Sequence, residues 1–324
     1  MSVPLIGANV HAPSKEAAPK EQWEATRALL SALPPKTPVR GDGLWHELNW
    51  DSRTEYGSEN LRAKLEALSI PGGTILLTII PLPWPGSWGW TTHGPWGYVD
   101  EREIPLIAKR FARMIEVIKI EAKALGISES RIVIQPFNEM AAGHPGGWAH
   151  LPQGEWWDRH GRLLVACFKL ARFGRMKVAA PPLSMQDHPE VVARRERETA
   201  APILKAIARY CDYSSVHSRT YAPHLGTVAY AEIALKNLRE RMALASSLTG
   251  GRPPICSELY VFEADRGANA DAPEVWRYLA PRLPDNVWVY HVGGGSGSPT
   301  TSVSLETFRR ISAERTATVK PPPK

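Results

Sequence analysis

Two glutamates stand out because each closes a short apolar run. Glu139 follows the run Ile-Val-Ile-Gln-Pro-Phe and Asn138, and Glu258 ends the run Ile-Cys-Ser. Two carboxyl groups flanking a glycosidic bond can break it, because one protonates the leaving oxygen while the other attacks the anomeric carbon. One of the two must stay protonated near neutral pH while its partner is ionised. We predict Glu139 as the acid/base and Glu258 as the nucleophile.

Polar residues at comparable positions could support this pair. Arg40 ends another apolar run and supplies a cation that would favour the ionised form of Glu258. Tyr221 could hydrogen-bond the nucleophile and hold its rotamer, and Asn138 could bind the sugar hydroxyl next to the reacting carbon. His217 ends the run that precedes Tyr221, so we include it among the substrate-binding candidates.

Short apolar runs alternate along the chain with longer amphipathic segments. The runs are rich in β-branched residues, which is typical of strands buried on both faces of a parallel sheet. The sequence predicts eight strands, at Val3–Val10, Thr37–Gly41, Gly73–Ile80, Arg131–Phe137, Met176–Ala180, Tyr213–His217, Pro254–Leu259 and Asn286–Val292.

The amphipathic segments carry apolar residues near the helical period. They predict helices at Lys20–Leu33, Ser58–Leu68, Glu103–Leu125, Gly154–Phe173, Pro189–Arg209, Thr227–Leu248, Ala272–Leu283 and Ser304–Arg315. Gly126, Gly174 and Gly250 follow helices and are predicted as left-handed stops. Ser58 and Ser304 are predicted as N-caps.

Eight alternating strands and helices fit either an open doubly wound sheet or a closed barrel. The first strand is not followed by Gly-x-Gly-x-x-Gly, and none of the predicted turns is a compact phosphate loop, which favours the barrel. We predict an α/β protein with a single (β/α)8 TIM barrel as the catalytic domain at 1–315, and a disordered, proline-rich tail at 316–324. The candidates above then lie at the carboxyl ends of the strands, where barrel active sites are found.

Several segments resemble the cellulase-like glycoside hydrolases of clan GH-A. Ile-Gln-Pro-Phe-Asn138-Glu139-Met resembles the fourth-strand Asn-Glu signature of that clan, and Ile-Cys-Ser-Glu258-Leu-Tyr resembles its seventh-strand nucleophile segment. Pro-Val-Arg40 resembles its second-strand arginine. The resemblance spans nearly the whole chain in order and position. It implies retention of anomeric configuration through a covalent glycosyl-enzyme, with no metal and no cofactor.

Two regions depart from the clan pattern. Val-His217-Ser-Arg-Thr-Tyr221 is similar to the sixth-strand His-x-Tyr region, but its spacing is longer. The clan usually places a sugar-platform tryptophan at the end of strand eight. In this chain Trp288 comes early in that strand, and His291 and a glycine-rich run follow it. We predict Trp288 and His291 as substrate-binding residues.

Many of the twelve tryptophans fall in segments predicted as loops after strands, namely Trp45, Trp50, Trp84, Trp88, Trp90, Trp96 and Trp148. Indole rings at the rim of a barrel can stack on the C–H faces of sugars. The alternative is that the rings fold the long loop after the third strand onto itself as a small apolar core. We expect both uses, with Trp88 and Trp90 lining the substrate groove.

Composition narrows the range of partners. Apolar residues make up 43% and charged residues 22% of the chain, which is typical of a globular protein. The net charge of +6 comes from basic residues interleaved with acidic ones on predicted helices, so we expect no nucleic-acid partner. Cys167, Cys211 and Cys256 are odd in number and widely spaced, which favours buried apolar positions over disulfides or a zinc site.

The sequence also bears on the compartment. Every apolar run is shorter than the roughly 20 residues of a membrane helix, so we expect no membrane association. The first ten residues lack a charged segment followed by a long apolar one, which predicts no signal peptide. We therefore expect a cytoplasmic protein, or one carried by a larger particle, unless a leader has been removed.

Two other functions compete with a glycosidase. A metal-dependent barrel hydrolase would use histidines to hold zinc, commonly as His-x-His on the first strand with an Asp ending the eighth, and this sequence has neither. A catalytically inactive glycan-binding barrel would be expected to have lost one carboxylate, and both are present. The partner that we predict is a carbohydrate polymer or oligosaccharide. The sugar, the linkage, endo or exo action and the oligomeric state stay open.

Overall fold

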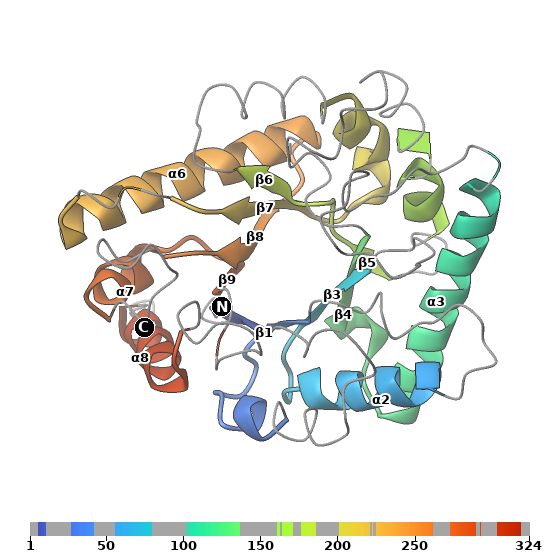
Figure 1. Ribbon diagram of the computed structural model, residues 1–324, viewed down its shortest axis with the longest axis horizontal. Helices are drawn as coiled ribbons and strands as arrows, with labels where there is room; N and C mark the ends of the chain where they lie inside the picture. Colours follow the sequence, from blue (N-terminus) through green and yellow to red (C-terminus); the bar gives the residue numbers. More distant parts are fainter. Residues whose placement is uncertain are drawn as a thin grey trace, which may run out of the picture.

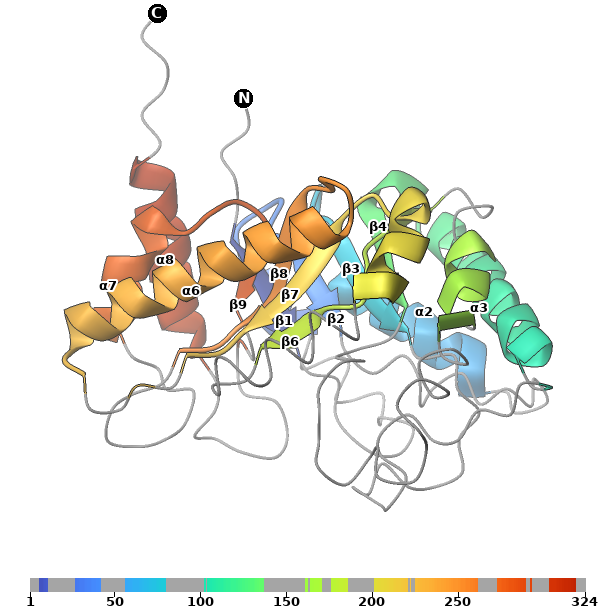
Figure 2. The same cartoon turned by 90° about the horizontal axis from the view of Figure 1, so that it is seen from above.

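The structure is a computed structural model. It describes residues 6–10, 27–41, 56–79, 102, 104–136, 161–162, 164–170, 176–185, 201–220, 222, 225–261, 273–289, 292 and 303–318. In these parts of the chain, strands surround one centre and helices lie outside them (Figure 1). Seen from above, α6, α7 and α8 lie on one side of the strands and α2 and α3 on the other (Figure 2).

The strands form one parallel sheet in the order β5-β4-β3-β2-β1-β9-β8-β7-β6. Their bounds are β1 Gly7–Val10, β2 Val39–Gly41, β3 Ile75–Ile79, β4 Ile132–Pro136, β5 Lys177–Val178, β6 Leu183–Met185, β7 Ser214–Ser218, β8 Pro254–Leu259 and β9 Val287–Val289. All eight predicted strand positions are therefore occupied by strands, most of them shorter than predicted.

The two ends of the sheet meet at β5 and β6. A parallel bridge joins Ala179, directly after β5, to Tyr213, directly before β7, which pairs with β6. Pro181 and Pro182 lie between β5 and β6 and lack the N–H that a sheet needs. The two segments thus act as one strand interrupted by prolines, and β6 is the part that the sequence did not predict. The curled sheet of eight parallel strands confirms the predicted (β/α)8 barrel.

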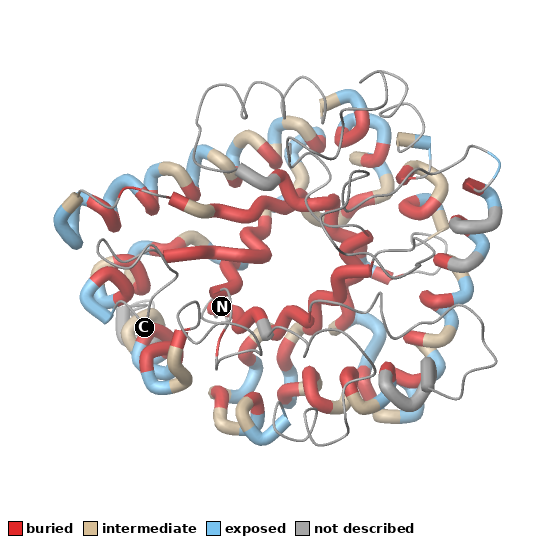
Figure 3. Tube along the Cα trace, viewed as in Figure 1, coloured by how far each residue is buried: buried red, intermediate tan, exposed pale blue. Residues whose placement is uncertain are grey.

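Helices follow the strands around the outside of the sheet. Residues 27–31, 161–162, 164–170 and 201–207 are helical, and the longer helices are α2 Tyr56–Leu68, α3 Ile104–Ala124, α6 Thr227–Leu248, α7 Pro273–Leu279 and α8 Leu305–Thr318. Single 3-10 turns lie at Glu129–Arg131, Ala208–Tyr210 and Ala280–Arg282. The strands are buried, while the helices are buried on the inward side and exposed on the outward side (Figure 3). Among the described residues, no helix has the length and apolar character needed to cross a membrane.

Two of the predicted helix stops are confirmed. Gly126 and Gly250 have φ angles of 68° and 66°, the left-handed conformation that glycine adopts without steric cost. Gly174 lies outside the described residues. α8 continues past the predicted end at Arg315 to Thr318.

One predicted N-cap is confirmed and one is wrong. Ser304 precedes α8, and its hydroxyl accepts a hydrogen bond from the backbone N–H of Thr307 at 3.1 Å. Ser58 lies inside α2, which begins at Tyr56. Serine costs little inside a helix, so its presence does not by itself fix where a helix starts.

Apolar side chains form two cores. The larger one fills the space between sheet and helices and includes Phe111, Phe168 and Phe308. A smaller cluster consists of Leu76, Val133, Ala179, Ile255 and Trp288, with Tyr213 packed against it. Successive residues of a strand face opposite sides, so these residues face the interior while their strand neighbours face the helices. We call this smaller cluster the barrel floor.

At one position of β1, the barrel floor leaves room only for glycine. A Cβ added to Gly7 would clash with the indole ring of Trp288 on the neighbouring strand. We predict that Gly7→Ala lowers the free energy of unfolding by about 1–3 kcal/mol, measured by denaturant titration. Combining it with Trp288→Leu should restore part of that loss.

Gly161→Ala provides the matched control for this prediction. A Cβ at Gly161 would lie in ordinary contact with Ile203, 3.4 Å from its Cγ1 atom. We expect no destabilisation there, because alanine is the better helix former. An unchanged stability of Gly7→Ala would contradict the clash.

Candidate active site

Polar side chains occupy the barrel interior immediately above the barrel floor. On β3 and β4, Thr78 and Gln135 come two residues after the floor residues Leu76 and Val133 and face the same side. The buried polar residues of the strands that we group here are Asn9, Arg40, Thr78, Gln135, Ser215, His217, Ser257 and Glu258. They lie toward the carboxyl ends of the strands, where the active sites of barrel enzymes are found.

A β-bulge in β8 brings Glu258 into this layer. In the pairing of β7 with β8, Val216 is opposite Cys256, but the next residue, His217, is opposite Glu258. Strand β8 therefore contains one extra residue, Ser257, at this point. Bulges re-aim side chains in this way and occur often beside active sites.

The bulge changes which side of the sheet each residue faces. Cys256 packs outward in the large core and Leu259 does so again further along. Between them, the Ser257 hydroxyl lies inside, 3.1 Å from that of Ser215, and Glu258 also faces the interior. In a regular strand of the same sequence, strict alternation would turn Glu258 toward the helices.

Arg40 forms a buried ion pair with Glu258. The Nη1 atom of Arg40 donates to Oε1 of Glu258 at 2.6 Å, and the two side chains are 0% and 5% exposed. Nε and Nη2 of Arg40 donate to the hydroxyl of Thr78 at 3.1 and 2.9 Å. The guanidinium thus compensates a carboxylate charge that would be costly to bury alone.

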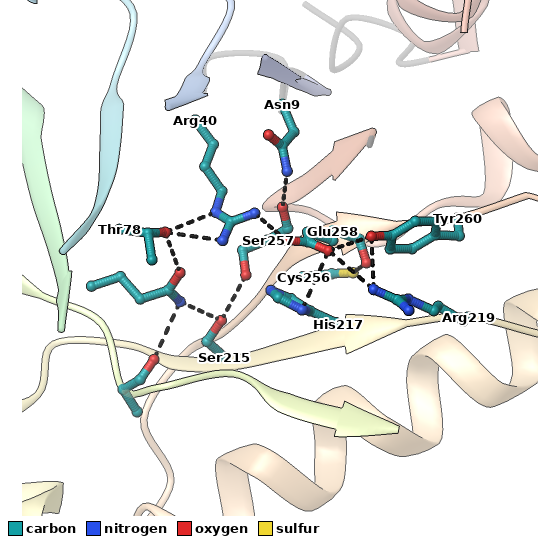
Figure 4. Close-up of polar contacts among 12 residues, drawn as sticks. Asn9, Arg40, Thr78, Ser215, His217, Arg219, Cys256, Ser257, Glu258 and Tyr260 are labelled. Carbon is teal, nitrogen blue, oxygen red and sulfur yellow. Dashed lines mark hydrogen bonds and ion pairs between the residues drawn. The ribbon is translucent and has the colours of Figure 1, made fainter. Parts of the chain in front are cut away.

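A hydrogen-bond network connects this pair to the other strands. The Thr78 hydroxyl donates to Oε1 of Gln135 at 3.1 Å, and Nε2 of Gln135 donates to Ser215 Oγ at 2.8 Å and to the carbonyl of Ala180 at 3.3 Å. Asn9 Nδ2 donates to the carbonyl of Ser257 at 3.5 Å. The network runs from β2 through β3 and β4 to β7 and β8, so it holds the interior of the barrel at a fixed spacing (Figure 4).

The second carboxylate oxygen of Glu258 faces another group of side chains. The hydroxyl of Tyr260 donates to Oε2 at 2.7 Å, and Nδ1 of His217 lies 3.4 Å from the same oxygen. Nη2 of Arg219 lies 3.8 Å from Oε2 and donates to the Tyr260 hydroxyl at 2.8 Å. Figure 4 shows these side chains converging on Glu258 from β7 and β8.

The structure brings together three of the residues predicted from the sequence: Arg40, His217 and Glu258. Trp288 is placed in the barrel floor and is 5% exposed, below the polar layer. The remaining predicted residues lie outside the described part of the chain, and their roles stay predictions: Glu139, Asn138, Tyr221, Trp88, Trp90 and His291.

Sequence reasoning missed Tyr260 and Arg219. Strand periodicity could have identified both, because residues two apart share a face of a strand. Tyr260 comes two residues after Glu258, and Arg219 comes two residues after His217. Thr78 and Gln135 were missed because they sit inside apolar runs, where a polar residue gives no sign of its partner.

The cysteines are free thiols in the apolar interior, as predicted. Burial raises the pKa of the Cys256 thiol to about 12, and it raises the pKa of the Cys167 and Cys211 thiols as well. Thiols of this kind stay protonated near neutral pH and are poor nucleophiles. In the described residues, no three His, Cys, Asp or Glu side chains group so that they could hold a metal ion.

The buried ion pair generates a stability prediction. Arg40→Met removes the cation and leaves the Glu258 carboxylate buried without its charge partner, so we expect a loss of about 3–5 kcal/mol in unfolding free energy. In a Glu258→Gln background the same change should cost much less, because the charge is absent. Denaturant titration of the two single variants and the double variant measures both costs.

Arg27→Met is the matched control, because Arg27 makes an ion pair of the same 2.6 Å length with Glu66, and the two side chains are 59% and 42% exposed. An exposed pair contributes roughly 0–1 kcal/mol. Equal losses for Arg40→Met and Arg27→Met would contradict the role assigned to burial.

The sequence matches no family model and no curated protein. The structure, in contrast, is similar to solved barrels. A GH5_18 protein from Streptomyces cattleya in complex with Manβ1-4GlcNAc has a TM-score of 0.62 at 15% identity, covering 99% of this chain and 83% of that protein. A GH5-4 broad specificity endoglucanase from an uncultured bacterium has a TM-score of 0.61 at 9% identity, covering 97% of this chain and 94% of that protein.

Fungal β-1,4-galactanases are similar as well, with a TM-score of 0.55 at 15% identity over 94% of this chain and 99% of theirs. Identities this low show a common fold. The chain has the same barrel fold as these solved GH5 proteins, which is the fold that the resemblance of its sequence segments predicted.

Proposed function

We propose that the protein is a retaining glycoside hydrolase that cleaves β-glycosidic bonds of a poly- or oligosaccharide, with Glu258 as nucleophile and Glu139 as acid/base. The observation that carries the proposal is the environment of Glu258. A β-bulge aims this carboxylate into the interior of the barrel, and a buried arginine compensates its charge. A carboxylate that a bulge turns inward and a buried cation compensates is expected to be a reactive group more than a structural one.

In the first step, the Glu258 carboxylate attacks the anomeric carbon while Glu139 gives its proton to the leaving oxygen. One carbon–oxygen bond breaks and a glycosyl ester on Glu258 forms. In the second step, Glu139 takes a proton from water, whose oxygen attacks the same carbon and releases Glu258 as a carboxylate. Two displacements at one carbon retain its configuration.

The contacts of Glu258 fit this cycle. Arg40 donates to Oε1, so the carboxylate is already paired when it attacks and does not depend on water for its solvation. When the ester forms, the negative charge on Glu258 is lost and the ion pair with Arg40 weakens. In the second step the returning charge restores the pair, which favours departure of the sugar.

The names of the similar structures guide the choice of substrate. They include an endoglucanase, β-1,4-galactanases and a protein in complex with Manβ1-4GlcNAc. We therefore propose β-linked glucans, galactans and mannans as the first polymers to test, with xylans and amino-sugar polymers beside them. The tryptophans predicted at the rim favour action on a polymer or a long oligosaccharide.

The test is release of reducing sugar from this panel by the wild-type chain and by Glu258→Ala. We expect release by the wild type from at least one polymer and a loss of at least about 1000-fold in the variant, because the nucleophile is gone. NMR of the first product should show a retained anomeric configuration. Glu274→Ala, which removes an exposed glutamate on α7, is the control and should behave as the wild type.

Equal release by the wild type and Glu258→Ala would sink the assignment of the nucleophile. Inversion in the first product would rule out double displacement, as would a separation of the two carboxyl groups in the range of roughly 6.5–9.5 Å rather than near 5–5.5 Å. An absence of release from all polymers, with binding to one of them, would favour the inactive glycan-binding barrel.

A further prediction concerns the rim tryptophans. If Trp88 and Trp90 line the groove, replacing both by alanine should raise KM for a long substrate by about tenfold, since each stacked ring contributes apolar contact area. The KM for the shortest hydrolysed oligosaccharide should change much less. An unchanged KM for the long substrate would assign the two rings to folding of the loop.

A further inference from the structure

Hydrogen bonds connect Arg219 to Tyr260 and Tyr260 to Oε2 of Glu258. Arg219 follows β7 directly and Tyr260 follows β8 directly, and the backbone N–H of Tyr260 donates to the carbonyl of Ser218 at 3.0 Å, so the two ends stay in register. Nη1 of Arg241, on α6, donates to the Ser218 hydroxyl at 3.1 Å and to the Arg219 carbonyl at 2.7 Å. The backbone that carries both side chains is therefore held from two directions.

The chemistry of the three groups determines which atom is the donor in each of these hydrogen bonds. A guanidinium only donates hydrogen bonds, so in the 2.8 Å contact the Arg219 nitrogen is the donor and the Tyr260 oxygen the acceptor. The one proton of the phenol is then left for Oε2 of Glu258, at 2.7 Å. The Arg219 guanidinium also lies over the Tyr260 ring, 4.1 Å from its centroid, which fixes the plane of the ring.

The result is a carboxylate held at both oxygens. The terminal torsion of a glutamate is broad, so a single partner leaves the carboxylate free to turn. Arg40 holds Oε1 and Tyr260 holds Oε2 from the opposite side, and Tyr260 itself is 8% exposed. The second cation, Arg219, forms only a long ion pair, 3.8 Å from Oε2, so the short hydrogen bond at this oxygen comes from the neutral phenol.

We propose that Tyr260 is a positioning residue that fixes the reactive carboxylate of Glu258, and that Arg219 acts through it by directing the phenolic proton. The inference rests on the proposed function of Glu258 as nucleophile. The sequence predicted a hydrogen bond to Glu258 from Tyr221. In the structure Tyr260, which directly follows the strand of Glu258, makes such a bond. A neutral donor suits this position, since it orients the carboxylate, whereas a second ion pair as short as the one with Arg40 would resist the loss of charge when the ester forms.

The first experiment is Tyr260→Phe, which keeps the ring and its contact with Arg219 and removes only the hydroxyl. We expect kcat on the best substrate to fall on the order of 10- to 100-fold, with KM changed by less than about threefold. The acidic limb of the pH–rate profile should move to higher pH, because the carboxylate loses a donor that favours its charged form. A purely structural hydroxyl would not move that limb.

Tyr278→Phe is a matched control. The Tyr278 hydroxyl donates to Glu232 at 2.9 Å, and Arg282 lies over its ring at 4.0 Å, so the same three residue types meet on the surface between α6 and α7. We expect no change in kcat or in the pH profile. Wild-type behaviour of both tyrosine variants would overturn the proposal, and so would equal effects at the two sites.

The role of Arg219 is tested by Arg219→Met in the wild-type and Tyr260→Phe backgrounds. If Arg219 acts through the phenol, its replacement lowers kcat clearly in the wild-type background and much less once the hydroxyl is gone. Equal fold-losses in the two backgrounds would assign Arg219 an action independent of Tyr260 and overturn that part of the proposal.

A readout without substrate separates this inference from the proposed function. In thermal unfolding near neutral pH, Tyr260→Phe should lower Tm by about 2–4 °C, and by much less in a Glu258→Gln background, since the lost bond is to a charged group. A wild type that hydrolyses nothing would refute the proposed function, while this double-mutant cycle still reports on the Tyr260–Glu258 contact. Equal Tm shifts in the two backgrounds would overturn the positioning role.

Discussion

The interior of this barrel is organised by the need to bury a carboxylate at Glu258. A charge at that depth is unfavourable unless a partner and hydrogen bonds replace the water that it loses. Arg40 meets this need, but a buried guanidinium has further donors of its own, and these require acceptors. Thr78 and Gln135 continue the network to Ser215, so one buried charge determines the polar identity of positions on the four strands β2, β3, β4 and β7.

The backbone has to adapt to the same requirement. A regular strand would direct Ser257 inward and Glu258 outward, and the large core would then have to accept a charged group. The bulge lets both residues face the interior, while Cys256 and Leu259 still fill the core on the outer side. The apolar barrel floor below, with Trp288 at its centre, keeps the polar layer toward the carboxyl ends of the strands.

How much of this could be predicted from the sequence differs between elements for physical reasons. The β8 strand was predicted at its observed bounds because Gly250, Gly251 and Pro253 separate this short run from the preceding helix. Arg40, His217 and Glu258 were found because they lie at or near the ends of such runs. The bulge could not be predicted, since strand periodicity assumes strict alternation and one extra residue does not change the composition of the run. β6 was missed because Pro181 and Pro182 interrupt the apolar run from which a strand is predicted.

The tyrosine contact shows why order along the chain is a weaker guide than spatial position. In the clan GH-A pattern a tyrosine follows the histidine of the sixth strand at a short spacing, and this chain has Arg219 there. The requirement at Oε2 of Glu258 is for one neutral donor at hydrogen-bonding distance, and neighbouring parallel strands bring equivalent positions together whichever strand carries the side chain. Tyr260 meets the requirement from β8, while Arg219 on β7 becomes its partner. A site of this kind is therefore constrained by what each atom of the carboxylate must contact, and the strand that supplies the contact is free to differ.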